Sequence, residues 1–216
     1  MFRYFIFDLD GTIAYTLDDL TNGINMMLDH FCLPRIDKEH ALLSINNGVR
    51  KFVYRCLPDG MGDDPEFFEE ALAVYKAFYK ENCLVTTRPY PHVVEGLKYL
   101  KDKGAKMAVF SNKQHEGTVK IVEALFPNTF DVVLGGQNGF AHKPEPDGAI
   151  YIAEQFGAKP SEIAFVGDSD VDMTTAKNAG MHPIGVSWGY RPPSLLTELG
   201  AERIISDLES FKALVD

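Results

Sequence analysis

Short apolar runs alternate with helical patterns along most of the chain. The first run covers residues 3–8, is rich in aromatic residues and ends in a carboxylate. A continuous run of this length is typical of a strand that is buried on both faces of a sheet. The same pattern predicts further strands over residues 105–111, 132–136, 163–169 and 182–188, with a sixth candidate at 203–206.

Helical patterns separate these runs. Apolar residues recur every three or four positions, and several of the segments stop at a glycine, a residue that often follows a helix. The predicted helices cover residues 91–104, 115–125, 147–156 and 170–179. Because strand and helix alternate, we expect an α/β protein in which βαβ crossovers build a parallel sheet with helices on both faces.

One long segment lacks strand patterns. After the first strand, apolar residues recur only at helical spacing, in stripes over residues 17–31, 49–57 and 65–79. We therefore expect an all-helical unit of residues 15–85, inserted into a core of residues 1–14 and 86–216. The ends of the unit fall near Tyr15 and Thr86, where we expect a pair of hinge strands.

Composition and charge narrow the classes of function. Of the 216 residues, 45% are hydrophobic, and 31 acids against 21 bases give a net charge of −10. This balance is typical of a globular protein and argues against binding to nucleic acid or to an anionic membrane surface. No window approaches the ~18 apolar residues of a membrane span. Three scattered cysteines indicate neither a disulfide framework nor a zinc site, so we expect a cytoplasmic protein. For its oligomeric state, we expect a monomer or a homodimer.

Polar residues follow the predicted strands at their carboxyl ends, where parallel sheets bind ligands. Four segments supply them: Asp8 with Asp10, Ser111 with Asn112, Lys143, and Asp168 with Asp172. Carboxylates brought together repel one another unless a cation neutralises them. Oxygen ligands without a histidine or cysteine cluster favour Mg²⁺, which in proteins commonly binds a substrate phosphate as well. We therefore expect Mg²⁺ as the cofactor and a small phosphorylated metabolite as the partner.

The spacing of Asp8 and Asp10 suits phosphoryl transfer. Side chains two residues apart in an extended strand end share one face, so those of Asp8 and Asp10 would lie on the same side. One carboxylate can attack phosphorus to form an aspartyl-phosphate, and the other can give a proton to the leaving group and later take one from water. A lysine and backbone N–H groups would neutralise the charge on the phosphoryl oxygens.

Taken together, these segments resemble the four motifs of the haloacid dehalogenase superfamily. DLDGT at residues 8–12 is similar to the first motif, and Ser111-Asn112 is similar to the second. Lys143 in HKPEPDG is similar to the third motif, and Asp168 and Asp172 in GDSDVD are similar to the fourth. The resemblance covers the whole chain. It implies a Rossmann-like parallel-sheet core with an inserted all-helical cap domain that selects the substrate.

The resemblance also implies roles for the metal-binding and reacting residues. Asp8 is the expected nucleophile and, through its other oxygen, a Mg²⁺ ligand. Asp10 is the expected general acid/base, with its backbone carbonyl on the metal, and Asp168 is the expected third ligand. A carboxylate at position 10 favours phosphoryl transfer over dehalogenation, because an alcohol leaving group needs a proton and a halide does not.

Four further residues receive supporting roles from the resemblance. Ser111 would bind a phosphoryl oxygen, helped by backbone N–H groups that include that of Asn112. Lys143 would hold the phosphate and Asp8 together. Asp172 would act on a metal-bound water or on Lys143 without binding the metal itself.

The inserted unit resembles the phosphoglycolate phosphatase branch of the superfamily. Gly48-Val49-Arg50 is similar to a stretch that opens a helix in that branch. Arg50 could bind the carboxylate of 2-phosphoglycolate bidentately, and Gly48 could free backbone N–H groups for an anion. The branch usually has an acid and a small hydroxyl residue where this chain has Tyr15 and Thr16. The same scaffold serves sugar-phosphate mutases of the phosphoglucomutase type and pyrophosphatases, and a non-catalytic binding protein is a further alternative.

Overall fold

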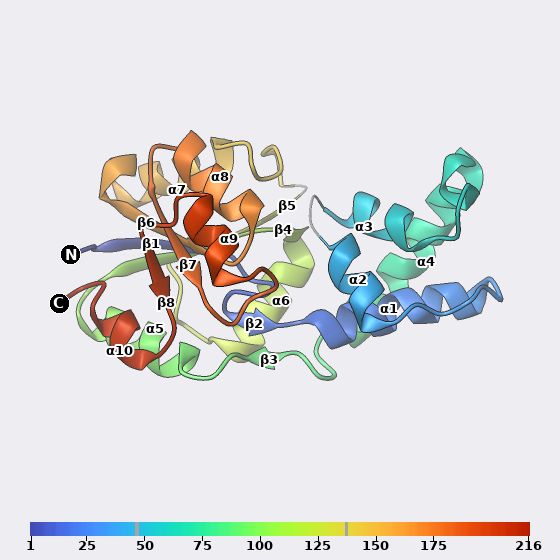
Figure 1. Ribbon diagram of the computed structural model, residues 1–216, viewed down its shortest axis with the longest axis horizontal. Helices are drawn as coiled ribbons and strands as arrows, with labels where there is room; N and C mark the ends of the chain where they lie inside the picture. Colours follow the sequence, from blue (N-terminus) through green and yellow to red (C-terminus); the bar gives the residue numbers. More distant parts are fainter. Residues whose placement is uncertain (46–47, 137) are drawn as a thin grey trace. The chain divides into compact units, whose positions relative to one another are not determined.

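The computed structural model describes residues 1–45, 48–136 and 138–216. Figure 1 labels the principal elements along the chain. In chain order they are β1 (Tyr4–Phe7), β2 (Ala14–Tyr15), α1 (Leu17–His30), α2 (Lys38–Ser44), α3 (Val49–Cys56), a 3₁₀ turn (Met61–Asp63), α4 (Pro65–Asn82), β3 (Arg88–Pro89), α5 (Val93–Asp102), β4 (Lys106–Gln114), α6 (His115–Leu125), β5 (Val132–Gly136), α7 (Asp147–Phe156), a 3₁₀ turn (Pro160–Glu162), β6 (Ile163–Gly167), α8 (Asp170–Asn178), β7 (His182–Val186), α9 (Pro193–Glu198), β8 (Arg203–Ile205) and α10 (Leu208–Lys212).

The core is a parallel sheet of six strands in the order β5-β4-β1-β6-β7-β8. All of its pairings are parallel, which confirms the predicted α/β sheet. The strand β1 lies between β4 and β6, so that the chain reverses its direction of winding beside β1. The carboxyl ends of these three strands therefore meet at one edge, which is where ligands bind in such sheets.

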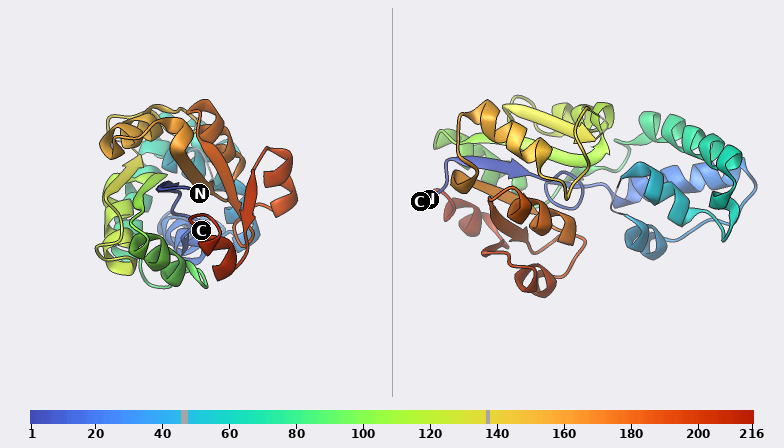
Figure 2. Two further views of the ribbon diagram at one scale, coloured as in Figure 1. Left: turned by 90° about the vertical axis from the view of Figure 1, so that its left-hand side faces the viewer. Right: turned by 90° about the horizontal axis from the view of Figure 1, so that it is seen from above.

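Both faces of the sheet are covered by helices (Figures 1 and 2). Ile6 of β1 is fully buried in a cluster with Phe110 of β4, Phe165 of β6 and residues of α7 and α8. The alternate residue Phe7 is also fully buried and packs edge-on against Phe130, which follows α6. Burial on both faces explains why β1 reads as a continuous apolar run, and each such side chain contributes about 1.5–3 kcal/mol.

Residues Tyr15–Arg88 form a second compact unit, which is helical. Its helix α1 packs on α4, and α3 packs on α4 and α2. Gly23 lets α4 come close, because a Cβ there would lie 3.2 Å from the rings of both Tyr75 and Tyr79. Three of its helices match the predicted stripes. The short helix α2 was not predicted; it begins where the Asp37 carboxylate accepts a hydrogen bond from the His40 N–H at 2.8 Å.

Two short strands carry the chain between the units. β2 and β3 pair in a two-stranded sheet, near the positions where hinge strands were predicted. The guanidinium of Arg88 on β3 lies 4.4 Å from the ring centroid of Tyr15 on β2, which is a cation–π contact between the two short strands. The Tyr15 hydroxyl donates to the Asp18 carboxylate at 2.8 Å, and Asp18 also pairs with Lys38 at 2.6 Å.

Asp19 fixes the end of the helical unit that leads into β3. Its side chain is 1% exposed, and its carboxylate accepts hydrogen bonds of 2.6–3.0 Å from the N–H and hydroxyl groups of both Thr86 and Thr87. Burial works against the charged form of Asp19, but these hydrogen bonds outweigh it and lower the pKa of the carboxyl group. None of the helices in the described ranges is long and apolar enough to span a bilayer.

We expect Asp19→Ala to lower the free energy of unfolding by about 2–3 kcal/mol, because it leaves the buried N–H and hydroxyl groups of Thr87 without an acceptor. Asp29→Ala is the matched control: it removes an acid from the same helix whose partner is the exposed Arg35. Urea unfolding followed by circular dichroism measures both variants. Equal, small effects of the two substitutions would show that the Asp19 contacts do not stabilise the unit.

Candidate active site

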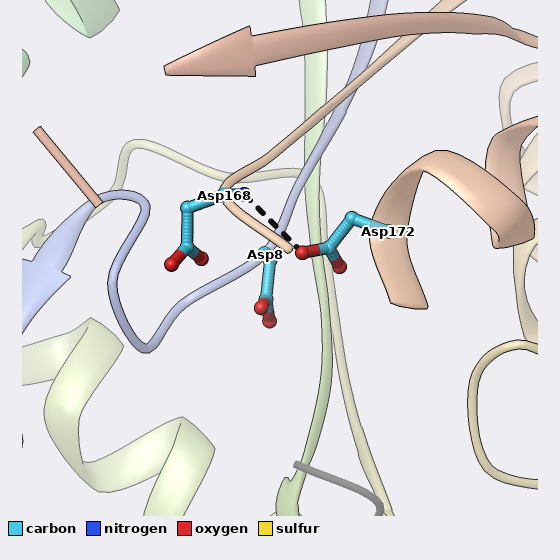
Figure 3. A group of neighbouring side chains, drawn as sticks. All are labelled: Asp8, Asp168 and Asp172. Carbon is cyan, nitrogen blue, oxygen red and sulfur yellow. Dashed lines mark hydrogen bonds between the residues drawn. The ribbon is translucent and has the colours of Figure 1, made fainter. Parts of the chain in front are cut away.

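Three buried aspartates meet at the carboxyl edge of the sheet. Asp8 follows β1, Asp168 follows β6, and Asp172 lies in the first turn of α8 (Figure 3). One carboxylate oxygen from each lies within 4.8 Å of the others. The three residues are 9%, 1% and 0% exposed. Such a group is unstable by itself, so the surrounding contacts have to supply positive charge or hydrogen-bond donors.

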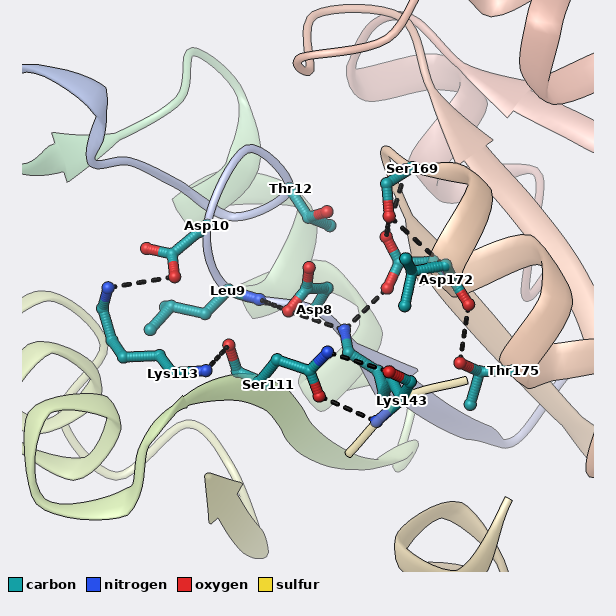
Figure 4. Close-up of polar contacts among 12 residues, drawn as sticks. Asp8, Leu9, Asp10, Thr12, Ser111, Lys113, Lys143, Ser169, Asp172 and Thr175 are labelled. Atoms are coloured by element: carbon teal, nitrogen blue, oxygen red, sulfur yellow. Dashed lines mark hydrogen bonds and ion pairs between the residues drawn. The ribbon is translucent and has the colours of Figure 1, made fainter. Parts of the chain in front are cut away.

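Lys143 supplies the positive charge closest to these aspartates. Its Nζ lies 2.9 Å from Asp8 Oδ1 and 2.6 Å from Asp172 Oδ1 (Figure 4). The ammonium group also lies 5.8 Å from the ring centroid of Phe110 and 5.7 Å from that of Phe165. Aromatic rings from β4 and β6, the two strands that flank β1, thus help to hold a lysine that is only 3% exposed.

Asp172 is engaged on both carboxylate oxygens. Oδ1 contacts Lys143, and Oδ2 accepts hydrogen bonds from the Ser169 hydroxyl at 2.6 Å and from the N–H groups of Ser169 and Asp168 at 3.1 and 3.2 Å. The Ser169 Oγ in turn accepts a hydrogen bond from the Asp172 N–H and so caps the N-terminus of α8. Asp172 is therefore suited to orienting Lys143 and the turn after β6, and less suited to binding a metal directly.

Asp168 is held by the loops on either side of it. Oδ1 accepts a hydrogen bond from the Thr12 hydroxyl at 2.9 Å, and Oδ2 accepts one from the Tyr190 N–H at 2.7 Å. A Cβ at Gly11 would lie 2.4 Å from Oδ2, and a Cβ at Gly189 would lie 2.1 Å from the Asp168 Cβ. Gly11 also has a φ of 82°, which glycine adopts without strain. Glycine at both positions lets the two loops close over this carboxylate.

Asp10 points to a second lysine, which the sequence reasoning missed. Lys113 Nζ lies 3.0 Å from Asp10 Oδ2, and the two side chains are 6% and 16% exposed. The side chain of Asp10 does not belong to the group formed by Asp8, Asp168 and Asp172. A signal was present in the sequence, since Lys113 follows the Ser111-Asn112 motif directly.

Ser111 and Asn112 lie on β4 beside Asp8 and Lys143. Ser111 is 2% exposed, and its Oγ accepts a hydrogen bond from the Lys113 N–H at 3.3 Å. The Asn112 side chain forms two hydrogen bonds with the backbone of Lys143, accepting from its N–H at 2.8 Å and donating to its carbonyl at 3.0 Å. Asn112 thereby fixes the loop that carries Lys143, a contact that the motif alone did not predict.

Burial dominates the protonation of this cluster. It is the largest cause that raises the pKa of Asp8 to about 7; Lys143 opposes it, and Asp172 and Asp10 add to it. Burial, followed by repulsion from Asp172 and Asp8, raises the pKa of Asp168 well above its usual range. For Lys143, burial favours the neutral amine, but the two carboxylates outweigh it and raise the pKa of the ammonium group.

The donor set fits a divalent cation. With all groups ionised, Asp8, Asp10, Asp168 and Asp172 carry four negative charges against two positive charges on Lys113 and Lys143, which leaves two negative charges in a buried site. A hard divalent cation with oxygen ligands would balance them. Asp8 and Asp168 are the better side-chain ligands, because Asp172 is already bound by Lys143 and three further donors.

The two predicted substrate-binding residues of the helical unit have contacts of their own. Gly48 is the N-cap of α3 with a φ of 87°, a conformation that suits glycine. Arg50 donates to both carboxylate oxygens of Glu69, at 2.5 and 3.1 Å, and its guanidinium lies 4.9 Å from the ring centroid of Phe68. The Arg50 side chain is 53% exposed, so that Glu69 is an exchangeable partner.

Comparisons with known proteins show what the whole chain is similar to. The model of a family described as haloacid dehalogenase-like hydrolase matches residues 5–186. A phosphoglycolate phosphatase of Thiobacillus denitrificans is 32% identical over 213 residues, which is 97% of this chain and 94% of the relative. One of Aquifex aeolicus is 34% identical over 87% of this chain and 86% of its own. The solved structure of a predicted phosphoglycolate phosphatase from Haemophilus somnus superposes with a TM-score of 0.91 at 29% identity, covering 100% of this chain and 98% of that one.

Metal binding has a predicted effect on stability that depends on pH. Without metal, the raised pKa values of Asp8 and Asp168 mean that the folded protein keeps protons that the unfolded chain has lost, so stability falls as pH rises through about 7. Mg²⁺ at about a hundred times its Kd should raise Tm by ~5–10 °C, and more at pH 8 than at pH 6.

Differential scanning calorimetry with Mg²⁺ and with EDTA measures this effect. Asp168→Asn should abolish the Mg²⁺-dependent rise in Tm, whereas Asp170→Asn, which changes an exposed acid two residues along, should keep it. A rise of equal size in both variants would mean that the metal binds elsewhere.

Proposed function

Because the chain belongs to the haloacid dehalogenase-like hydrolase family and is a phosphatase, we propose that it hydrolyses a small anionic phosphate ester, most simply 2-phosphoglycolate, through an aspartyl-phosphate on Asp8. The observation that carries this proposal is the setting of Asp8. Its Oδ1 accepts hydrogen bonds from the Leu9 N–H at 2.7 Å and from Lys143 at 2.9 Å. These two donors orient the carboxylate at the edge of the sheet, as a nucleophile requires.

The proposed reaction has two steps. In the first, an oxygen of Asp8 bonds to phosphorus, the bond from phosphorus to the ester oxygen breaks, and Asp10 gives its proton to the departing alcohol. In the second, Asp10 takes a proton from water as that water attacks phosphorus, which releases phosphate and restores the Asp8 carboxylate. The position of Asp10, two residues beyond Asp8, suits the exchange of protons on the leaving-group side.

The remaining residues of the site would bind the phosphoryl group or hold its binding residues in position. Lys143 and the Ser111 hydroxyl would contact the phosphoryl oxygens, while Asp172 and Asn112 hold Lys143 in place through its ammonium group and its backbone. A bound Mg²⁺, held by Asp8, Asp168 and the carbonyl of Asp10, would neutralise charge on the phosphoryl group as it transfers.

The helical unit, Tyr15–Arg88, is proposed to be the cap that selects the substrate. Relatives that are named phosphoglycolate phosphatases match nearly the whole chain, so the helical segment is part of the resemblance. Within it, Arg50 would exchange Glu69 for the carboxylate of 2-phosphoglycolate, and the N-terminus of α3 at Gly48 would favour the same negative charge.

A substrate panel tests the proposal. We expect Mg²⁺-dependent phosphate release from 2-phosphoglycolate with a kcat/KM at least ~10-fold above that for pyrophosphate, hexose phosphates, nucleoside monophosphates and p-nitrophenyl phosphate, since an extra ion pair in the substrate complex is worth that factor or more. A preference for pyrophosphate would replace the proposed substrate by an inorganic one. Interconversion of sugar phosphates without net phosphate release would identify a mutase.

We expect Asp8→Asn to reduce phosphate release by about 10⁴-fold or more, because no other group replaces a lost nucleophile. The wild type, quenched with acid during turnover of labelled substrate, should carry a protein-bound phosphate that hydroxylamine removes, as it does from acyl phosphates. Asp59→Asn, at an exposed acid of the helical unit, is the control and should retain both properties. Labelling of the Asp8→Asn protein would assign the nucleophile to another residue.

A further inference from the structure

We propose that Lys113 is a specificity-determining residue of this site, whose ammonium group binds an anionic group on the alcohol part of the substrate. The inference rests on the proposed function and deepens it, since it names the feature of the leaving group that the core of the enzyme recognises. It starts from the two lysines of the site, which lie on different sides of Asp8 (Figure 4).

The two lysines are bound to different carboxylates. Lys143 contacts Asp8 and Asp172, which places its charge beside the nucleophile and hence beside the phosphoryl group. Lys113 contacts Asp10 at 3.0 Å. Asp10 is the residue that would give a proton to the departing oxygen, so its partner Lys113 lies beside the leaving group and not beside the transferred phosphoryl group.

Lys113 is built into the site and is not a mobile surface lysine. Its side chain is only 6% exposed, and its backbone is fixed on both sides. The Lys113 N–H donates to Ser111 Oγ at 3.3 Å, and the buried Thr118 hydroxyl lies 3.3 Å from the Lys113 carbonyl and 3.1 Å from that of Gln114. A nearly buried lysine loses hydration and side-chain entropy, so its position needs a reason beyond solubility.

The chemistry of the ammonium group supplies that reason. A lysine has three N–H donors, so Lys113 can keep Asp10 and bind a second anion at the same time. An anionic group two or three bonds from the ester oxygen lies within reach of a cation that already touches the proton donor. The carboxylate of 2-phosphoglycolate meets this condition, whereas an uncharged alcohol offers Lys113 only a neutral acceptor, which binds an ammonium group more weakly. A carboxylate has two oxygens, so binding by Lys113 is compatible with binding by Arg50.

A pair of matched esters tests the inference. 2-Phosphoglycolate and 2-hydroxyethyl phosphate share a two-carbon skeleton and differ in whether the far end is a carboxylate or a neutral alcohol. Lys113→Met removes the charge and keeps the length of the side chain. The ratio of kcat/KM for the two esters should fall by about 10- to 100-fold in this variant, the usual effect of losing a hydrogen bond between charged groups.

The ratio separates recognition from a merely structural role. A change that acts only through Asp10 or through folding lowers both esters by the same factor, leaves the ratio intact and overturns the inference. Lys113→Arg, which keeps a cation, should retain most of the preference. Lys98→Met removes the same charge from an exposed position on α5 and should leave the ratio unchanged.

Calorimetry separates a failure of this inference from a failure of the proposed function. Both esters are titrated with Mg²⁺ into the Asp8→Asn protein, with and without Lys113→Met, so that binding is measured without turnover. If the wild type hydrolyses neither ester but Lys113→Met still weakens binding of the anionic one selectively, the proposed substrate is wrong and the role of Lys113 stands. If binding of the two esters weakens equally or not at all, the role of Lys113 is wrong.

Discussion

The burial of three carboxylates at one edge of a parallel sheet is the constraint on which the rest of this site depends. Parallel strands bring Asp8 and Asp168 together because β1 and β6 are neighbours, and Asp172 follows in the first turn of α8. Left alone, these charges would repel one another and lose their hydration. Lys143 between Asp8 and Asp172 is the first compensation, and it is itself enclosed by aromatic rings of β4 and β6.

The backbone supports the same arrangement. Donors from the turn after β6 hold Asp172, and donors from the loops after β1 and β7 hold Asp168. Glycines at positions 11 and 189 let those loops approach, since a Cβ at either would overlap Asp168. The acidic net charge of the chain would repel an anionic substrate at long range, so recognition has to come from local positive charge. Lys113, Lys143 and the proposed divalent cation would supply this charge.

The sequence predicted what depends on local pattern. The strands of the sheet, their parallel direction and the strand-end aspartates follow from the apolar runs and from motifs that can each be recognised within one short segment. It did not predict the pairing of Lys113 with Asp10, which depends on how β4 lies beside the loop after β1. Nor did it predict the hydrogen bonds of Asn112 to the Lys143 backbone, which depend on how β4 lies beside the loop before α7. The helices α2, α9 and α10 were also missed, since five to seven residues are too few for a helical period to stand out.

The two lysines divide the recognition of an ester between its two parts. Lys143 has two buried carboxylate partners and aromatic faces around it, so its position varies little with the identity of the alcohol. Lys113 pairs with Asp10, the residue that would give a proton to the leaving group. One cation beside the constant phosphoryl group and a second beside the variable alcohol would allow the core to contribute to specificity by itself. If the helical unit selects the substrate as proposed, it would add to a preference that begins at the strand ends.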